Sequence, residues 1–148
     1  SGEVFLDGKE LTKEQVVQLR SVVHYNPQKN HLFNATVREN ITLWDNTKEI
    51  SLPEELGIQQ FCQLDDAVTE HGSQLSGGQR QRISIARALT QPHKLLLFDE
   101  STASLDMESA ARIEKMILSN TELTVIMVTH HFIEENRNLF DHVIQLEN

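Results

Sequence analysis

The sequence predicts a single α/β domain in which helices cover a largely parallel β-sheet. Two apolar runs, KLLLF at 94–98 and LTVIMV at 123–128, have the length and composition of strands that are buried on both faces. Between them, residues 107–119 place apolar side chains at helical spacing. Strands that alternate with helices are typical of an α/β fold with a mostly parallel sheet.

The other expected strands are short and end at turn residues. Asp7-Gly8 and Asn26-Pro27 are dipeptides that commonly end a strand. These strands are expected at 3–6, 21–25 and 142–146.

The expected helices are indicated by capping residues and by proline. Thr12 followed by Gln15 is a capping-box pattern, and Pro92 ends the helix that precedes it. The helices are expected at 13–20, near 36–41 and 53–64, at 77–90 and 107–119, and near 132–139.

The charge of the chain argues against a nucleic-acid partner. The 148 residues carry a net charge of −9, whereas contacts to nucleic-acid phosphates need a basic face. Arg80, Arg82 and Arg87 could form a local cationic patch, or they could lie on an ordinary solvated helix face. No apolar run approaches the roughly 20 residues that span a bilayer.

Polar side chains follow three of the expected strands. Asp99 and Glu100 follow 94–98, His130 follows 123–128, and Gln28 follows 21–25. Ligands of open α/β sheets bind at the carboxyl ends of the strands, so these side chains are expected at one edge. There, one carboxylate can hold Mg²⁺ and the next can orient or deprotonate a water molecule. Each residue alone would suit an ordinary polar loop, but their joint occurrence favours a site.

The LSGGQ turn at residues 75–79 predicts an anion-binding helix start. Ser76 is a preferred N-cap residue, and Gly77 and Gly78 let main-chain N–H groups approach a ligand without a Cβ in the way. The unpaired N–H groups and the dipole of a helix N-terminus favour negative charge. The alternative is an ordinary glycine-rich loop before a helix.

The order of the segments YNPQ, LSGGQRQR, LLLFDE, STASLD and VTHH resembles the nucleotide-binding domain of an ABC transporter. HLFNATVRENI and VTEHGSQLSGGQ are similar to segments of ABC exporters. The resemblance covers nearly the whole chain and implies a P-loop NTPase-like fold. It implies that residues 1–148 are a truncated ABC ATPase domain, in which about 30–74 form a shortened helical subdomain and the remainder a RecA-like core.

The resemblance also implies roles for individual residues, with ATP and Mg²⁺ as the ligands. The implied catalytic residues are Glu100 as the base, His130 as the switch histidine, and Gln28. The implied Mg²⁺ ligands are Asp99 and Gln28. The implied nucleotide-binding residues are Ser76, Gly77, Gly78, Gln79 and Asp106.

The phosphate loop of this family, GxxxxGK[ST], is missing from the sequence. In the only Gly-Lys pair, Gly8-Lys9, Glu3 stands five residues before the glycine and Glu10 follows the lysine. In the family that loop lies just upstream of a segment like SGEVFLDG, so the chain is expected to begin after it, with an incomplete N-terminal part. Asn26 also departs from the apolar residue that is more usual before Pro-Gln, which we interpret as variation.

The function that the resemblance implies is that of an ATPase domain of an ABC exporter. Its partners would be a second nucleotide-binding domain, bound head to tail around ATP, and the transmembrane domains, at the cytoplasmic face of the cell membrane. We expect these 148 residues alone to be inactive. Two alternatives remain open, namely a non-catalytic ABC-like binding module or remnant, and a soluble ABC ATPase that is not tied to transport.

Overall fold

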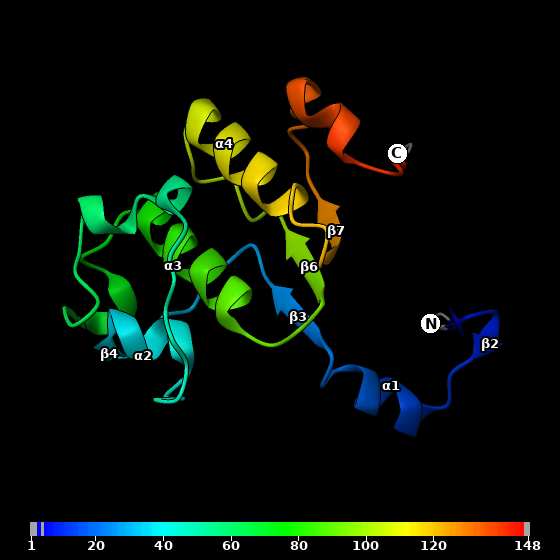
Figure 1. Ribbon diagram of the computed structural model, residues 1–148, viewed down its shortest axis with the longest axis horizontal. Helices are drawn as coiled ribbons and strands as arrows, with labels where there is room; N and C mark the ends of the chain where they lie inside the picture. Colours follow the sequence, from blue (N-terminus) through cyan, green and yellow to red (C-terminus); the bar gives the residue numbers. More distant parts are fainter. Residues whose placement is uncertain (1–2, 4, 147–148) are drawn as a thin grey trace.

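The computed structural model describes residue 3 and residues 5–146, and its centre is a three-stranded parallel sheet (Figure 1). The strand order is β3 (Val23–Asn26), β6 (Leu95–Asp99) and β7 (Thr124–Val128), with β6 in the middle. Leu97 of β6 is in register with Tyr25 on one side and with Ile126 on the other. The predicted α/β class with a mostly parallel sheet is therefore confirmed.

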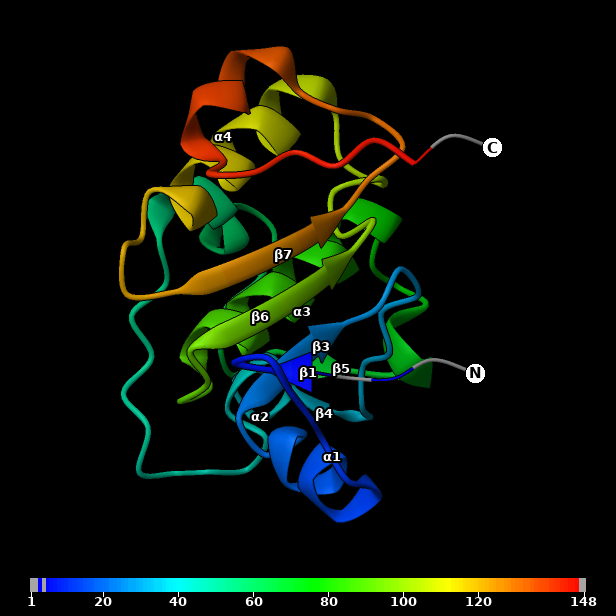
Figure 2. The ribbon, with the colours of Figure 1, turned by 90° about the vertical axis from the view of Figure 1, so that its right-hand side faces the viewer.

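Helices cover one face of this sheet. The long helices α3 (Gly77–Thr90) and α4 (Met107–Leu118) belong to the same hydrophobic core as the sheet, and α3 lies behind the strands in Figure 2. Leu96 and Phe98 of β6 point into this core and are buried. This arrangement fixes the start of α3 close to the carboxyl end of β6.

The opposite face of the sheet is open among the described residues. Tyr25, Ile126 and Val128 are 56%, 52% and 54% exposed, and they alternate with buried or half-buried neighbours along their strands. The expectation that the runs at 94–98 and 123–128 are buried on both faces is therefore wrong. Both runs are mostly apolar apart from Lys94 and Thr124, but within the described chain only one side of each strand meets the core.

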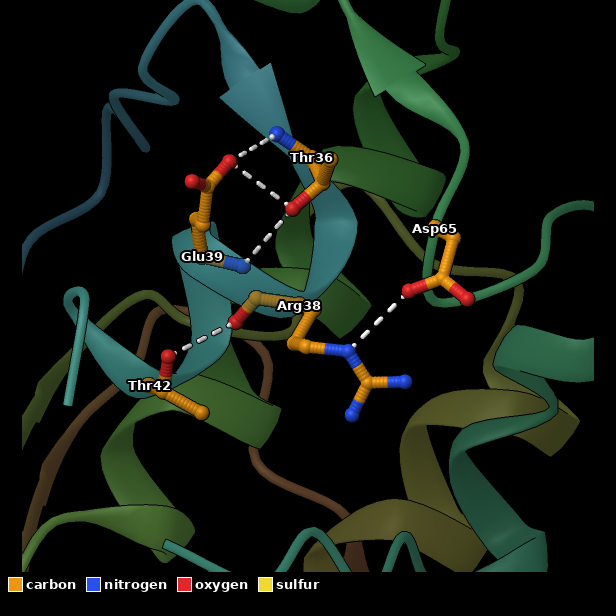
Figure 3. A network of polar contacts seen from close by, with 5 residues as sticks. All are labelled: Thr36, Arg38, Glu39, Thr42 and Asp65. Carbon is orange, nitrogen blue, oxygen red and sulfur yellow. Dashed lines mark hydrogen bonds and ion pairs between the residues drawn. The ribbon is translucent and has the colours of Figure 1, made fainter. Parts of the chain in front are cut away.

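The short helix α2 (Val37–Thr42) shows how local sequence places an element (Figure 3). Thr36 and Glu39 form a reciprocal capping box: the Glu39 carboxylate accepts from the Thr36 N–H at 2.8 Å, and the Thr36 hydroxyl accepts from the Glu39 N–H at 3.1 Å. Arg38 then pairs with Asp65 at 3.0 Å, and Thr42 donates to the Arg38 carbonyl at 3.1 Å. Since buried Val37 faces the core, α2 is held both by its cap and by packing.

The remaining elements are short. Two antiparallel ladders pair β1 (Phe5–Leu6) with β2 (Lys9–Glu10) and β4 (Ala35–Thr36) with β5 (Ala67–Val68). The other helices are α1 (Lys13–Leu19) and the 3₁₀ helices η1 (Glu54–Leu56), η2 (Ile58–Gln60), η3 (Glu70–Gly72) and η4 (Glu134–Leu139).

Three predicted elements differ from the structure. The strand expected at 142–146 does not form, and Ile144 and Leu146 are 83% and 86% exposed with no neighbouring strand in the described chain. The strand expected at 3–6, of which residue 4 lies outside the description, is reduced to β1. The helix expected at 53–64 is instead two 3₁₀ turns, because Gly57 adopts a left-handed conformation between them.

Candidate functional site

The carboxyl ends of the three parallel strands bring together the polar residues that the sequence singled out. His130 Nε2 lies 2.7 Å from Glu100 Oε1, and Gln28 Nε2 donates a hydrogen bond to Glu100 Oε2. The side chain of Glu100 is 16% exposed, whereas that of His130 is 80% exposed. Together with Asp99, the last residue of β6, we call these four residues the strand-end cluster. A half-buried carboxylate with a partner on each oxygen is oriented rather than mobile.

The main chain of Glu100 is held as firmly as its side chain. Its φ of 49° lies in the left-handed region, which costs a non-glycine residue on the order of 1 kcal/mol. Its N–H donates to the Val128 carbonyl at 2.8 Å, and its carbonyl accepts from Gln81 Nε2 and from the Ala103 N–H, both at 3.1 Å. These contacts hold the backbone in an otherwise unfavourable conformation and aim the carboxylate at the edge of the sheet.

Asp99 has a partner that sequence reasoning missed. The Tyr25 hydroxyl donates to Asp99 Oδ2 at 2.9 Å, and this hydrogen bond raises the pKa of the Tyr25 phenol. Tyr25 pairs with Leu97 in the neighbouring strand, and Leu97 and Asp99 are two residues apart, so all three side chains lie on the same face of the sheet. The contact could have been predicted from the sequence only if the register of these two strands had been known. Among the described residues, the aspartate is therefore held by a neutral hydroxyl group, without an ion-pair partner.

The strand-end cluster has the chemistry of a magnesium site with few protein ligands. Asp99 offers a carboxylate, and Gln28, which donates to Glu100 through its amide nitrogen, has an amide oxygen left for a cation. Mg²⁺ prefers such oxygen ligands and takes its other ligands from water and substrate phosphates. Across the described residues, no group of three or more His, Cys, Asp or Glu residues could hold a metal by itself. The residues therefore fit Mg²⁺ bound together with a phosphate ligand.

The LSGGQ turn begins α3 in the predicted way. Ser76 is the N-cap: its Oγ accepts from the Gln79 N–H at 3.2 Å, and Gln79 Oε1 accepts from the Ser76 N–H at 2.8 Å. Ser76 is exposed, so the turn lies at the surface. The first N–H groups of α3, at Gly77 and Gly78, therefore lie at an accessible helix N-terminus.

The two glycines also have a packing role that sequence reasoning missed. A Cβ on Gly78 would lie 3.0 Å from the Ser104 carbonyl oxygen, and one on Gly77 would lie 3.3 Å from the Ser104 Cβ. The loop that follows Glu100 thus packs directly against the LSGGQ turn. It ends at Asp106, the N-cap of α4, whose carboxylate accepts from the Ser109 N–H at 2.9 Å; this bond lowers the pKa of Asp106.

The arginines of α3 are used inside the chain. Arg80, Arg82 and Arg87 all donate to main-chain carbonyls, which belong to Gly72 and Leu75, to Leu56, and to His31 and Asn40, respectively. Neither of the two interpretations of these residues is right, because they form neither a cationic patch for ligands nor a solvated face. They fasten α3 to the segments on either side of it.

Asn26 is part of a buried polar network. It is 1% exposed; its Nδ2 donates to Ser101 Oγ at 2.8 Å, and its Oδ1 accepts from Ser84 Oγ. This network ties the end of β3 to α3 and to the residue after Glu100. The departure of Asn26 from the family pattern therefore has a structural role in this chain, because the side chain braces the segment that carries Gln28 and the segment that carries Glu100.

The fold and the strand-end cluster together indicate the general class of protein. A parallel sheet with acidic, histidine and glutamine side chains at its carboxyl edge, beside a glycine-rich helix start, is typical of P-loop NTPase-like α/β domains that handle nucleoside triphosphates.

Comparisons with known proteins then give the family. Residues 1–103 match the family model described as ABC transporter. The chain is 34% identical over 145 residues to ABC multidrug transporter MDR2 of Trichophyton tonsurans (strain CBS 112818), covering 88% of this chain and 10% of that protein. It is 37% identical over 141 residues to ATP-binding cassette sub-family B member 5 of Homo sapiens, covering 87% and 11%. The chain therefore belongs to the ABC transporter family.

A solved structure agrees with this assignment. A bacterial Atm1-family ABC exporter with ATP bound superposes with a TM-score of 0.75 at 29% identity, covering 88% of this chain and 25% of that one. The chain thus spans about a tenth of the length of the curated relatives it matches, and a quarter of the solved exporter chain. Within the described residues, none of the helices is both long enough and apolar enough to cross a bilayer.

Proposed function

We propose that the chain is part of the ATP-binding and ATP-hydrolysing module of an ABC exporter. The observation that carries this proposal is the contact of Glu100 with both His130 and Gln28 at the carboxyl ends of three parallel strands. The family assignment and the exporter relatives support it. We assign residues 30–74 to a shortened helical subdomain and the rest to the RecA-like core.

In the proposed reaction, Glu100 is the base that accepts a proton from the attacking water, or orients it. His130, exposed and 2.7 Å from Glu100, is placed to donate to an oxygen of the transferred phosphoryl group. Asp99 and Gln28 would hold Mg²⁺, which neutralises charge on the β- and γ-phosphates when it is bound. Gln28 also fixes the second oxygen of Glu100, so that the carboxylate faces the position of the water.

The LSGGQ turn serves a second ATP. We propose that its first N–H groups and the Ser76 hydroxyl bind the γ-phosphate of ATP held by the phosphate loop of another nucleotide-binding domain, with Asp106 beside that contact. Two such domains would pair head to tail and drive transmembrane domains from the cytoplasmic face of the membrane. We propose no nucleic-acid partner, because the chain carries a net charge of −9.

A matched pair of substitutions tests the assignment in the full-length protein. Glu100→Gln is expected to lower ATP turnover by about 10²–10⁴-fold, the usual effect of losing a general base. Glu122→Gln is the control, because Glu122 is exposed and its nearest charged partner is Lys94, 3.9 Å away. Turnover by Glu100→Gln at the level of the control would contradict the role of Glu100.

A second candidate is a binding module that hydrolyses nothing itself. For the 148 residues themselves, which contain no GxxxxGK[ST], the loop that supplies most phosphate contacts in this class is not at hand. Isothermal titration calorimetry of the 148-residue chain with Mg-ATP measures how tightly these residues bind ATP by themselves. We expect no binding at micromolar concentrations, and micromolar binding would contradict the proposed dependence on an external phosphate loop.

A further inference from the structure

Gln81 connects the LSGGQ helix to the loop that carries the catalytic carboxylate. Its Nε2 donates to the Glu100 carbonyl at 3.1 Å, and its Oε1 accepts from the Ser104 N–H at 2.9 Å. A few residues earlier in α3, Gly78 lies against the Ser104 carbonyl. One turn of α3 therefore contacts both ends of the segment 100–104.

The burial of Gln81 shows that these bonds decide its conformation. The residue is 1% exposed, and a buried amide that lacks partners is strongly unfavourable. Here both polar atoms of the amide are satisfied by main-chain groups of a single loop. Because the Glu100 backbone is left-handed, the direction of its carbonyl is not set by regular secondary structure, and the Gln81 amide is one of the two donors that fix it.

We propose that Gln81 is a positioning residue that couples the two half-sites of this chain. This inference rests on the proposed function, in which the LSGGQ turn binds one ATP and Glu100 acts on another. A shift of α3 when the turn engages phosphate moves the Gln81 amide, and with it the main chain of Glu100 and Ser104. Glu100 therefore takes its hydrolytic position together with closure of the LSGGQ turn.

Two substitutions of Gln81 separate its two bonds. Gln81→Leu removes both, whereas Gln81→Glu, measured above the pKa of its buried carboxyl, keeps an acceptor for the Ser104 N–H and has no donor for the Glu100 carbonyl. Gln91, the C-cap residue at the other end of α3, provides the matched control, because its Nε2 donates to the Ile41 carbonyl and its Oε1 accepts from Lys48, away from the strand-end cluster.

The first measurement is hydrogen–deuterium exchange of the full-length protein without nucleotide. Gln81→Leu is expected to speed exchange in the peptide covering 99–106 about fivefold, as for the loss of one partner of a main-chain N–H. Gln81→Glu keeps that peptide protected, and Gln91→Leu leaves it unchanged. Equal exchange in this peptide for Gln81→Leu and Gln91→Leu would overturn the proposal.

The second measurement is ATP turnover of the same proteins. Both Gln81 variants are expected to lose roughly tenfold or more in kcat, with KM for ATP within about twofold, since small displacements of catalytic groups cost up to about a hundredfold. Gln91→Leu keeps kcat. A native kcat in Gln81→Glu would refute the coupling, and if Gln81→Leu does not fold, Gln81→Glu still decides. If Glu100→Gln itself leaves turnover intact, the proposed function fails, while the exchange result still reports whether Gln81 holds the loop.

Discussion

The two glycines of the LSGGQ turn are adjacent in sequence but contact their neighbours differently, and this difference predicts unequal effects of alanine. At Gly78, a Cβ would lie 3.0 Å from the Ser104 carbonyl oxygen and 3.3 Å from Leu105 Cδ2. At Gly77, the nearest atoms would be Cβ and Oγ of Ser104, at 3.3 and 3.4 Å. The first contact is with a main-chain oxygen at the shorter distance, whereas the second is longer and involves an exposed serine whose Oγ can rotate away. Gly78→Ala should therefore destabilise the chain more than Gly77→Ala.

The size of the difference follows from two opposing terms. Either alanine gains helix propensity of up to about 1 kcal/mol, and this gain largely cancels when the two variants are compared. Overpacking against a backbone that must shift costs about 1–3 kcal/mol, whereas the longer contacts at Gly77 need only a small shift of the exposed Ser104 and cost less. We expect Gly78→Ala to have an unfolding free energy roughly 1–2 kcal/mol below that of Gly77→Ala.

Thermal and urea unfolding of the two variants measure this difference. For a chain of about this length, 1 kcal/mol corresponds to roughly 2–4 °C, so the expected gap in Tm is about 2–8 °C. The native chain fixes the reference, and equal slopes in urea would show that the unfolded states are comparable. Gly78→Ala with a Tm equal to or above that of Gly77→Ala would refute the close approach of the 104–105 loop.

Three titratable groups give further predictions. Burial raises the pKa of Glu114 above 4.5, so the native chain should lose stability relative to Glu114→Gln as pH rises from about 4.5, measured by urea unfolding at several pH values. Burial lowers the pKa of His24 from 6.5 to about 4, so its contribution is full above pH 6.5 and declines as pH falls toward 4; NMR titration of the ring should show a neutral imidazole at pH 6. The bond to Asp99 raises the pKa of Tyr25, so ultraviolet titration should show phenol ionisation above the ordinary value, and Asp99→Asn should bring it down.

Local signals in the sequence predicted the helix starts and the strand-end cluster. Thr12 and Ser76 are N-caps in the structure as predicted, because capping depends on residues within one turn. The meeting of Glu100, His130 and Gln28 was also predictable, since parallel strands place their carboxyl ends at one edge. The roles of these residues stay predictions.

Features that depend on distant neighbours were not predictable from local pattern. The segment at 142–146, which contains Val143, Ile144 and Leu146, was predicted as a strand, but a strand also needs an edge to pair with, and none is beside it in the described chain. Asn26 and Gln81 gave no signal, because a buried amide is recognisable only from the groups that surround it. The packing of Gly78 against Ser104 joins residues that belong to separate motifs of the sequence.

These contacts have a consequence for how the proposed site works. The carboxylate of Glu100 is oriented in the protein alone, by His130 and Gln28 on its side chain and by Gln81 on its main chain. Preorganised groups need little rearrangement during reaction, so the movement that we propose for Gln81 on closure of the LSGGQ turn is a small adjustment of a carboxylate that is already held. In the proposed function, ATP promotes the association of a second nucleotide-binding domain, whose phosphate loop then lies at the LSGGQ turn. The barrier to hydrolysis should therefore respond more to the docking of that domain than to occupancy of a single half-site.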